Sequence, residues 1–386
     1  MKPTKVLIVE DSPIARTILK RILQESPYTE VVGTAATGLE GLALLKEVNP
    51  DVVCTDLHMP KMNGLEFTSE VMATHPLPIL VISTSVQEED TKNVFELLDA
   101  GAVDIFPKPR GGEEDYNTIK KSLIEKIRIL SGVKVFTRRK KTGGLPSSSS
   151  PVAKSSSSHR EAKVSHPVAS EEKKQPPVKT HIQPIPPKLQ FQSPVYSSLK
   201  TKIVAIGAST GGPQALRTLL SPLPVKFPIP IICVQHISDG FLQGLLDWLT
   251  LCCSLPIKIA EEGEYPQGGV IYFPKERYHL EIDRFGRFHY STTSPVGGHR
   301  PSITVTFQSI AKYYRSAALG VLLTGMGRDG AVGMQSIAQM GGKTIAQNEA
   351  TSVVFGMPKE AIALGAAQQV LSLDAIAPAI LKVMTD

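Results

Sequence analysis

Short apolar runs alternate with amphipathic stretches in the first third of the chain. Residues Ile14–Leu23 carry apolar side chains at helical spacing. The runs that predict buried strands are Lys5–Val9, Asp51–Thr55, Ile79–Ser83 and Val103–Phe106. Buried strands that alternate with helices are typical of an α/β fold, here a doubly wound parallel sheet. Such a sheet binds its ligands at the carboxyl ends of its strands.

The last half of the chain repeats this pattern and predicts a second α/β domain with a doubly wound parallel sheet. Its predicted strands are Lys202–Gly207, Ile229–Gln235, Ala318–Thr324 and Lys343–Ala346. The region 256–293 does not follow the alternation, and we expect irregular structure there, with antiparallel pairing as one option.

The segment between these halves has a different composition. It holds Ser tetrads at 147–150 and 155–158 and Pro pairs at 176–177 and 186–187, with almost no aromatic residues. Because it cannot bury enough apolar area to offset the entropy of ordering, we expect a flexible, disordered linker. The predicted organisation is therefore a domain at 1–135, a linker at 136–199 and a domain at 200–386.

Charge is distributed unevenly between these parts. The net charge is +6, whereas residues 133–200 hold 13 Lys or Arg and 3 Asp or Glu, which leaves −4 for the rest. Two mildly acidic domains are poor candidates for reading nucleic acid. A DNA-binding regulator is favoured only by the basic linker, and no helix-turn-helix pattern follows it.

Composition also restricts the location of the protein. The hydrophobic content of 41% is normal for a globular protein, and no run approaches the roughly 18 apolar residues of a membrane span. The N-terminus does not have the pattern of a signal peptide. The four cysteines, Cys54, Cys233, Cys252 and Cys253, form no CxxC motif. We expect a cytoplasmic protein with buried thiols, no zinc site and no insertion into a membrane.

Polar residues follow the predicted strands of the first domain. Glu10 and Asp11 follow the first strand, Asp56 the second, and Lys108 the last, and Ser83 closes the strand between them. Clustered carboxylates repel one another unless a hard cation lies among them, and oxygen ligands suit Mg²⁺. With a metal and a lysine to neutralise charge, Asp56 can attack a phosphoryl group and hold it as an acyl phosphate.

Over residues 3–125 the sequence resembles the response-regulator receiver family. The resemblance includes Asp56-Leu57-His58-Met59-Pro60 and Asn63-Gly64 at the following turn. It implies that Asp56 is the phospho-acceptor, that Glu10 and Asp11 form the metal pocket with it, that Ser83 is the switch hydroxyl and that Lys108 is the invariant lysine. One departure is Ile105, which occupies the position of the usual switch aromatic, with Phe106 beside it.

The second domain opens with a G-x-S-x-G sequence, Gly207-Ala208-Ser209-Thr210-Gly211, between a predicted strand and a helix. Such a turn exposes a serine nucleophile, although the same residues could simply cap a helix. His236 follows the next strand as a candidate base, or as a structural histidine. Asp329 follows another strand end and could orient the imidazole.

Gly325, Gly327 and Gly330 also match G-x-G-x-x-G, with Glu349 further along, which is the dinucleotide-binding pattern. Against that interpretation, Asp329 would repel a pyrophosphate at the helix start.

Several further motifs complete the picture of this domain. They are Gln235-His236, His299-Arg300-Pro301-Ser302, Leu323-Thr324-Gly325-Met326-Gly327 and Ala346-Gln347-Asn348-Glu349. With the serine motif, they make nearly all of 200–386 resemble the chemotaxis protein-glutamate methylesterase family, CheB, in which a receiver precedes an esterase. The resemblance implies a Ser209 nucleophile, a His236 base and an Asp329 orienting acid, with Thr210 and the Met326 N–H supporting an oxyanion, and no cofactor in this domain.

The family also implies substrates and partners. These are methyl-accepting chemotaxis receptors, which would be demethylated and also deamidated at glutamine, and a chemotaxis histidine kinase as phosphodonor. Two alternatives stay open: a non-catalytic adaptor that binds receptor or kinase, and the same esterase in a pathway other than chemotaxis.

Overall fold

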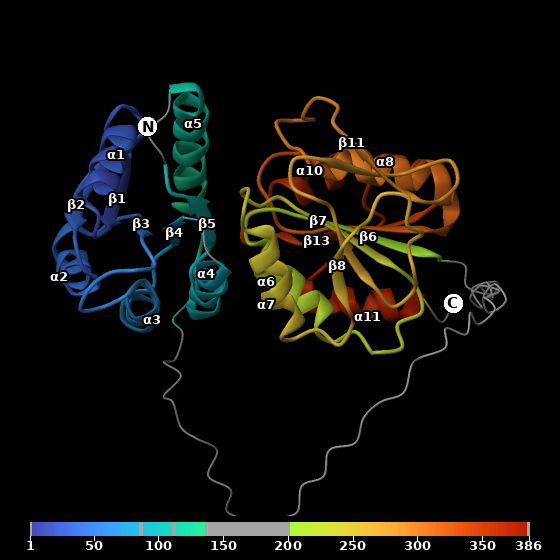
Figure 1. The fold of residues 1–386 in the computed structure, drawn as a ribbon, viewed down its shortest axis with the longest axis horizontal. Coiled ribbons are helices and arrows are strands. Elements are labelled where there is room, and N and C mark those ends of the chain that lie inside the picture. The colour runs from blue at the N-terminus through green and yellow to red at the C-terminus, as the bar shows by residue number, and fades with distance from the viewer. Residues whose placement is uncertain (1, 85–87, 110–112, 136, 138–200, 384–386) are drawn as a thin grey trace, which may run out of the picture. The chain divides into compact units, whose positions relative to one another are not determined.

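The computed structural model describes residues 2–84, 88–109, 113–135, 137 and 201–383, which form two α/β domains (Figure 1). Nearly all of the expected linker at 136–199 lies outside the described residues. In the part of the chain that is described, no helix is both long enough and apolar enough to cross a membrane.

A parallel five-stranded sheet forms the first domain, in the order β2-β1-β3-β4-β5. The strands are β1 (Thr4–Val9), β2 (Thr29–Ala35), β3 (Val52–Thr55), β4 (Ile79–Ser83) and β5 (Asp104–Pro107). The helices are α1 (Pro13–Gln24), α2 (Gly38–Val48), α3 (Gly64–Thr74), α4 (Glu88–Ala100) and α5 (Glu113–Leu130). The doubly wound sheet predicted from the sequence is confirmed.

The sheet of this domain has an apolar core on each face. Side chains of β1, β3, β4 and β5 pack with α1 and α5 on one face, and alternate residues of the same strands pack with α2, α3 and α4 on the other. This is the two-sided burial that continuous apolar strands require. Asn63 is the N-cap of helix α3 and forms a capping box with Glu66. The next residue must be glycine, because a Cβ on Gly64 would lie 2.1 Å from the backbone oxygen of Asp56.

The second domain is built on a parallel seven-stranded sheet in the order β14-β13-β12-β6-β7-β9-β8. These strands are β6 (Ile203–Ala208), β7 (Ile231–Gln235), β8 (Ile257–Ile259), β9 (Ile271–Phe273), β12 (Ala318–Leu322), β13 (Lys343–Gln347) and β14 (Gln369–Leu371). The helices are α6 (Gly212–Leu220), α7 (Leu242–Thr250), α8 (Ile303–Tyr314), α9 (Ala331–Gln339), α10 (Met357–Ala363) and α11 (Leu373–Val383), with 3-10 turns η1 (Arg315–Ala317) and η2 (Glu349–Thr351). Helices α6, α7 and α11 cover one face, and α8, α9 and α10 the other (Figure 1).

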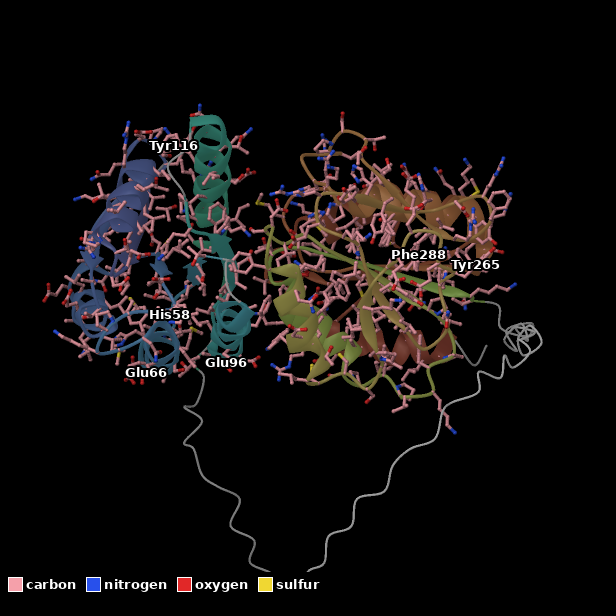
Figure 2. The ribbon with its side chains drawn as sticks, viewed as in Figure 1. His58, Glu66, Glu96, Tyr116, Tyr265 and Phe288 are labelled. Carbon is pink, nitrogen blue, oxygen red and sulfur yellow. The ribbon has the colours of Figure 1, made fainter. Side chains whose placement is uncertain are left out.

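The region 256–293 is more regular than expected. Its first two strands, β8 and β9, join the parallel sheet, and only β10 (His279–Ile282) and β11 (Phe288–Ser291) form an antiparallel pair. Phe288 anchors this pair with 1% of its surface exposed, whereas Tyr265 before it is 58% exposed (Figure 2).

The cysteines are free thiols, but they are not all buried. Cys54 and Cys233 are buried, whereas Cys252 and Cys253 are only partly buried. The expectation of buried thiols is therefore wrong for the last pair, which follows α7 in a surface turn where fewer side chains cover it.

Candidate functional site

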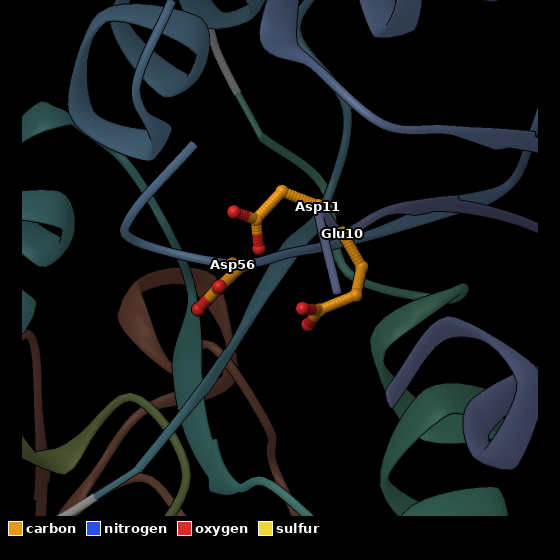
Figure 3. Close-up of side chains that lie close together, drawn as sticks. All are labelled: Glu10, Asp11 and Asp56. Atoms are coloured by element: carbon orange, nitrogen blue, oxygen red, sulfur yellow. The ribbon is translucent and has the colours of Figure 1, made fainter. Parts of the chain in front are cut away.

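Three carboxylates of the first domain converge at the carboxyl ends of β1 and β3 (Figure 3). Glu10, Asp11 and Asp56 each offer an oxygen, and these atoms all lie within 4.8 Å of one another. Glu10 and Asp56 are buried, and Glu10 Oε2 has no hydrogen-bond partner among the described residues. Burial raises the pKa of Glu10, and the charge of Asp56 raises it further. A buried orphan oxygen among repelling carboxylates is the environment that a hard divalent cation stabilises.

Lys108 supplies the positive charge of this cluster. Its Nζ lies 2.9 Å from Asp56 Oδ2 and 3.0 Å from Glu10 Oε1. Burial, together with the charge of Asp11, raises the pKa of Asp56 more than Lys108 and the hydrogen bond from Leu57 N lower it. The pKa of Lys108 is also raised: burial lowers it, but the contacts with Asp56 and Glu10 outweigh that effect. The ammonium group therefore stays charged and faces the Asp56 carboxylate.

Ser83 and Ile105 lie on the neighbouring strands β4 and β5. Ser83 is 2% exposed, and its carbonyl accepts a hydrogen bond from Lys108 N at 2.8 Å. Ile105 is buried against the α2–α4 face, and Phe106 points to the opposite core. The position of the usual switch aromatic is thus filled by an aliphatic side chain.

Ser209 of the second domain follows directly after β6. Its backbone N–H donates to Thr324 O at 3.0 Å, which fixes it beside the end of β12, and the residue is 8% exposed. The chain then turns sharply into α6. Gly211 has a φ of +74°, and a Cβ on Gly212 would lie 1.9 Å from Gln235 Oε1. Glycine is therefore required at both positions, for backbone conformation at the first and for space at the second.

His236 lies at the end of the adjacent strand, β7. Its backbone N–H donates to Ala208 O at 2.9 Å, and its ring Nε2 lies 2.9 Å from Asp329 Oδ2. An ionised carboxylate can only accept, so Nε2 carries the proton and Nδ1 of the neutral ring carries the lone pair. Nδ1 is buried without a partner among the described residues, and no hydrogen bond joins the ring to Ser209 there. The nitrogen left for a serine proton is therefore Nδ1.

Asp329 is held by the start of helix α8. Its carboxylate accepts hydrogen bonds from Ser302 Oγ, Ile303 N, Thr304 N and Gly330 N, in addition to His236. Burial raises the pKa of Asp329, but the hydrogen bond and charge of His236 and the Thr304 bonds hold it well below its ordinary value. The N-terminus of an α-helix favours an anion, which adds to this effect.

Ser302 and Thr304 received no role from sequence reasoning. The available signal was Ser302 itself, which directly precedes an apolar helical run and is the N-cap of α8. No pattern in the sequence indicated that a distant aspartate would share that cap.

The loop between β12 and α9 carries the glycines that resemble a dinucleotide motif. A Cβ on Gly325 would lie 2.7 Å from Ser209 Cβ, so this backbone passes directly beside the serine. Gly325 O accepts hydrogen bonds from Gly356 N and Met357 N, at 3.1 and 2.9 Å. Gly330 has a φ of +87° and abuts the side chain of Leu322. Close packing therefore explains Gly325 and Gly330, whereas Gly327 has open space around it and a φ of +78°, a backbone conformation that favours glycine.

Thr210 and Met326 lie on the two loops that meet at Ser209. Thr210 is 4% exposed, and its carbonyl accepts a hydrogen bond from Thr324 Oγ1 at 2.9 Å. In the described part of the chain, the backbone N–H groups of Thr210 and Met326 donate to no protein acceptor. Two unused donors on either side of a serine can stabilise a developing oxyanion.

His299 is a further residue of this site. Its ring stacks on His236 with the centroids 3.8 Å apart and an interplanar angle of 6°. Burial, and to a lesser degree the charge of His236, lower the pKa of His299 to about 4, although Asp329 opposes this shift. The ring is therefore neutral near pH 7 and covers one face of the imidazole.

The lowered pKa of His299 predicts a change in acid stability when it is replaced by phenylalanine. Between its ordinary pKa of 6.5 and about 4, the unfolded chain takes up a proton that the folded chain does not. The contribution of the neutral His299 ring to the stability of the folded chain is therefore complete above pH 6.5 and is lost as pH falls toward 4. When the pH is lowered from 7 to 4, the free energy of unfolding should fall by about 2 kcal/mol less in His299→Phe than in the parent.

Urea unfolding at both pH values measures this difference. His289→Phe is the matched control, because His289 is exposed and its ring pairs with Glu262 among the described residues. Equal acid sensitivity in the parent and His299→Phe would contradict the expected linkage.

Comparisons with known proteins agree with the two-domain arrangement. A family model described as CheB methylesterase matches residues 204–380, and a response regulator receiver domain model matches residues 6–120. A protein-glutamate methylesterase/protein-glutamine glutaminase of Nitrosospira multiformis is 37% identical over 382 residues, which cover 99% of this chain and 97% of that protein. A protein of the same description from Geobacter metallireducens is 36% identical over 381 residues, 97% of each chain.

Among solved structures, the Thermotoga maritima CheB methylesterase catalytic domain is 37% identical with a TM-score of 0.46, covering 47% of this chain and 98% of that one. Because the identity to the full-length relatives extends over both domains, the chain belongs to the protein-glutamate methylesterase/protein-glutamine glutaminase family.

Proposed function

We propose that this chain is a phosphorylation-regulated esterase that hydrolyses glutamyl methyl esters on methyl-accepting chemoreceptors and also deamidates glutamine side chains. The observation that carries the proposal is the buried His236–Asp329 pair, whose Nε2 and Oδ2 atoms lie 2.9 Å apart. The pair lies at the sheet edge where Ser209 directly follows the neighbouring strand, β6. This pair gives a serine at that edge a base whose orientation and tautomer are already fixed.

In the proposed reaction, His236 Nδ1 takes the proton of Ser209 Oγ as the oxygen attacks the ester carbonyl carbon. The N–H groups of Thr210 and Met326 stabilise the oxyanion. The ester C–O bond then breaks, and the protonated imidazole returns its proton to methoxide, which leaves as methanol. Water attacks the acyl-serine by the same route and releases the glutamate carboxylate and the serine. With a glutamine substrate, ammonia leaves in place of methanol.

The role of Asp329 in this reaction is to support the imidazole as its charge changes. When His236 takes up the serine proton, its ring becomes a cation beside a buried carboxylate that five hydrogen bonds keep ionised. This pairing stabilises the imidazolium without moving any group. The same contact keeps Nδ1 available as the basic nitrogen before reaction.

Regulation is assigned to the first domain. A chemotaxis histidine kinase would transfer a phosphoryl group to Asp56, with Lys108 Nζ at 2.9 Å neutralising the charge. Glu10, Asp11 and Asp56 have the oxygen donors that suit Mg²⁺, which when bound would offset charge on the phosphoryl oxygens. Phosphorylation would raise the fraction of chains with an accessible Ser209, in the cytoplasm where the kinase acts. A coupling of about 3 kcal/mol changes that fraction roughly a hundredfold.

The test is methanol release from methylated receptor by the full-length chain, with and without a small acyl phosphate as donor. The parent should release methanol, and the phosphodonor with Mg²⁺ should accelerate release. Asp56→Asn should keep the basal rate and lose the acceleration, because its amide cannot form an acyl phosphate.

Two results would contradict the proposal in different ways. Receptor binding without any methanol would favour an adaptor that does not catalyse. Acceleration that persists in Asp56→Asn would remove the regulatory part alone.

A further inference from the structure

Gln235 links the two strand ends that carry Ser209 and His236. It is the last residue of β7 and is 4% exposed. Its Nε2 donates to Ser209 O at 2.8 Å and to His236 O at 2.7 Å. Both amide hydrogens are thus used on backbone carbonyls of the two residues. Because an amide oxygen could not face two carbonyls, the orientation of this side chain is fixed by its surroundings.

The other end of the amide is not satisfied. Gln235 Oε1 is buried and has no hydrogen-bond partner among the described residues. It is packed against Gly212, where an added Cβ would lie only 1.9 Å away. A buried acceptor without a donor is rare in folded proteins and requires an explanation. Against this cost stand the two hydrogen bonds that the amide donates, which points to a role in holding the Ser209 and His236 carbonyls.

The geometry of the peptide unit suggests that role. Ser209 C=O and Thr210 N–H belong to one planar trans peptide, so the N–H points opposite to the carbonyl. Ser209 O accepts a second hydrogen bond from Gly212 N at 2.7 Å. Two donors therefore fix the carbonyl, and with it the direction of the unused Thr210 N–H. They also polarise the amide, which makes its N–H a stronger donor.

The second candidate oxyanion donor is built in the same way. Met326 N–H shares its peptide with Gly325 C=O, which accepts from Gly356 N and Met357 N. Both unused N–H groups thus belong to peptides whose carbonyls accept two hydrogen bonds. At Met326 both donors are backbone, whereas at Thr210 one donor is the Gln235 side chain. Only the Thr210 arrangement can therefore be altered by replacing a single side chain.

We propose that Gln235 is a positioning residue for the esterase reaction. It holds the Ser209–Thr210 peptide so that Thr210 N–H points to the place where the oxyanion forms, and it ties this peptide to the end of β7 beside His236. The inference rests on the proposed function, and it assigns to Gln235 a contribution to the transition state and none to substrate binding.

The test compares Gln235→Met with the parent full-length chain on methylated receptor. Methionine has a similar length and no amide donor. We expect kcat to fall about 10- to 100-fold with KM within twofold, since a displaced N–H loses part of the hundredfold or greater effect of one oxyanion donor. Gln368→Met is the matched control. Its amide donates to Gly342 O and accepts from Thr344 N at the amino end of β13, and kcat should stay within twofold.

A second readout separates positioning from a structural role. A receptor peptide with a boronic acid in place of the methyl ester forms a tetrahedral adduct with the serine and places an oxygen in the oxyanion site. Its Kd should rise in Gln235→Met by the factor by which kcat/KM falls. Should Gln235→Met fold poorly, Gln235→Asn provides the same comparison, because its shorter amide cannot reach both carbonyls.

The outcomes are distinct. The positioning role would be overturned if the lower kcat of Gln235→Met returned to the parent value once rates are divided by the fraction of chains whose serine can be titrated. A boronate Kd that does not change in Gln235→Met would overturn it as well. Absence of methanol release by the parent would instead refute the proposed function.

Discussion

Replacing Ser209 with alanine should lower methanol release from methylated receptor by about 10⁴- to 10⁶-fold. The substitution removes the proposed nucleophile, and loss of a serine nucleophile in a triad has effects of this size. Deamidation of receptor glutamine should fall by the same factor, because both reactions would pass through Ser209. Release of methanol and of ammonia, each measured with the full-length variant, tests the expectation.

Two controls accompany this variant. Ser336→Ala alters a hydroxyl on helix α9 that bonds only Val332 O, so its methanol release should equal that of the parent. Transfer of phosphate to Asp56 from a small acyl phosphate should be unchanged in Ser209→Ala, which would show that the first domain remains intact. Substantial ester hydrolysis by Ser209→Ala would mean that another nucleophile carries the reaction.

Asp329→Asn should lower kcat about 10³- to 10⁴-fold. Asparagine can present an N–H to His236 Nε2, which would leave the ring proton on Nδ1 and remove the base. It would also place N–H against Ile303 N, which now donates to the same oxygen as His236, Asp329 Oδ2, at 2.8 Å. We therefore expect a loss of stability of about 2–4 kcal/mol in addition.

Asp283→Asn separates these two effects. Asp283 also accepts backbone hydrogen bonds, from Phe285 N and Arg287 N, but it lies in the turn between β10 and β11. This control should lose stability while kcat stays near the parent value. Kinetics and urea unfolding of both variants separate the loss of kcat from the loss of stability. Full activity in folded Asp329→Asn would contradict the proposal that Asp329 orients the His236 ring.

Most of the sheet architecture could be predicted because its central strands are buried on both faces. The strands β1, β3, β4, β6, β7 and β12 are continuous apolar runs, and their parallel order follows from the helices between them. The strands that sequence reasoning missed lie toward sheet edges. In β2 only Thr29 and Ala35 are buried, and β14 is mostly exposed. Without burial on two faces, β2 and β14 carry little apolar signal, whereas β9 is buried but has only three residues, too few to show a pattern.

The candidate sites divide in a similar way. Residues at strand ends could be placed together, because parallel strands bring their carboxyl ends to one edge. The positions of His299 and Ser302 could not be predicted, because they depend on how the chain between β11 and α8 folds back over the sheet. The role inferred for Gln235 depends on the hydrogen bonds of a single amide, and no periodicity or spacing encodes those.

In the proposed reaction, the orientation of the His236 imidazole restricts which esters can react. Nδ1 is bonded to the carbon that joins the ring to the main chain, so a group protonated there departs into space bounded by the histidine's own backbone. Nε2, the more open nitrogen, is already occupied by Asp329. Proton delivery from this nitrogen would therefore favour compact leaving groups, and methanol and ammonia are among the smallest that an acyl carbon can release.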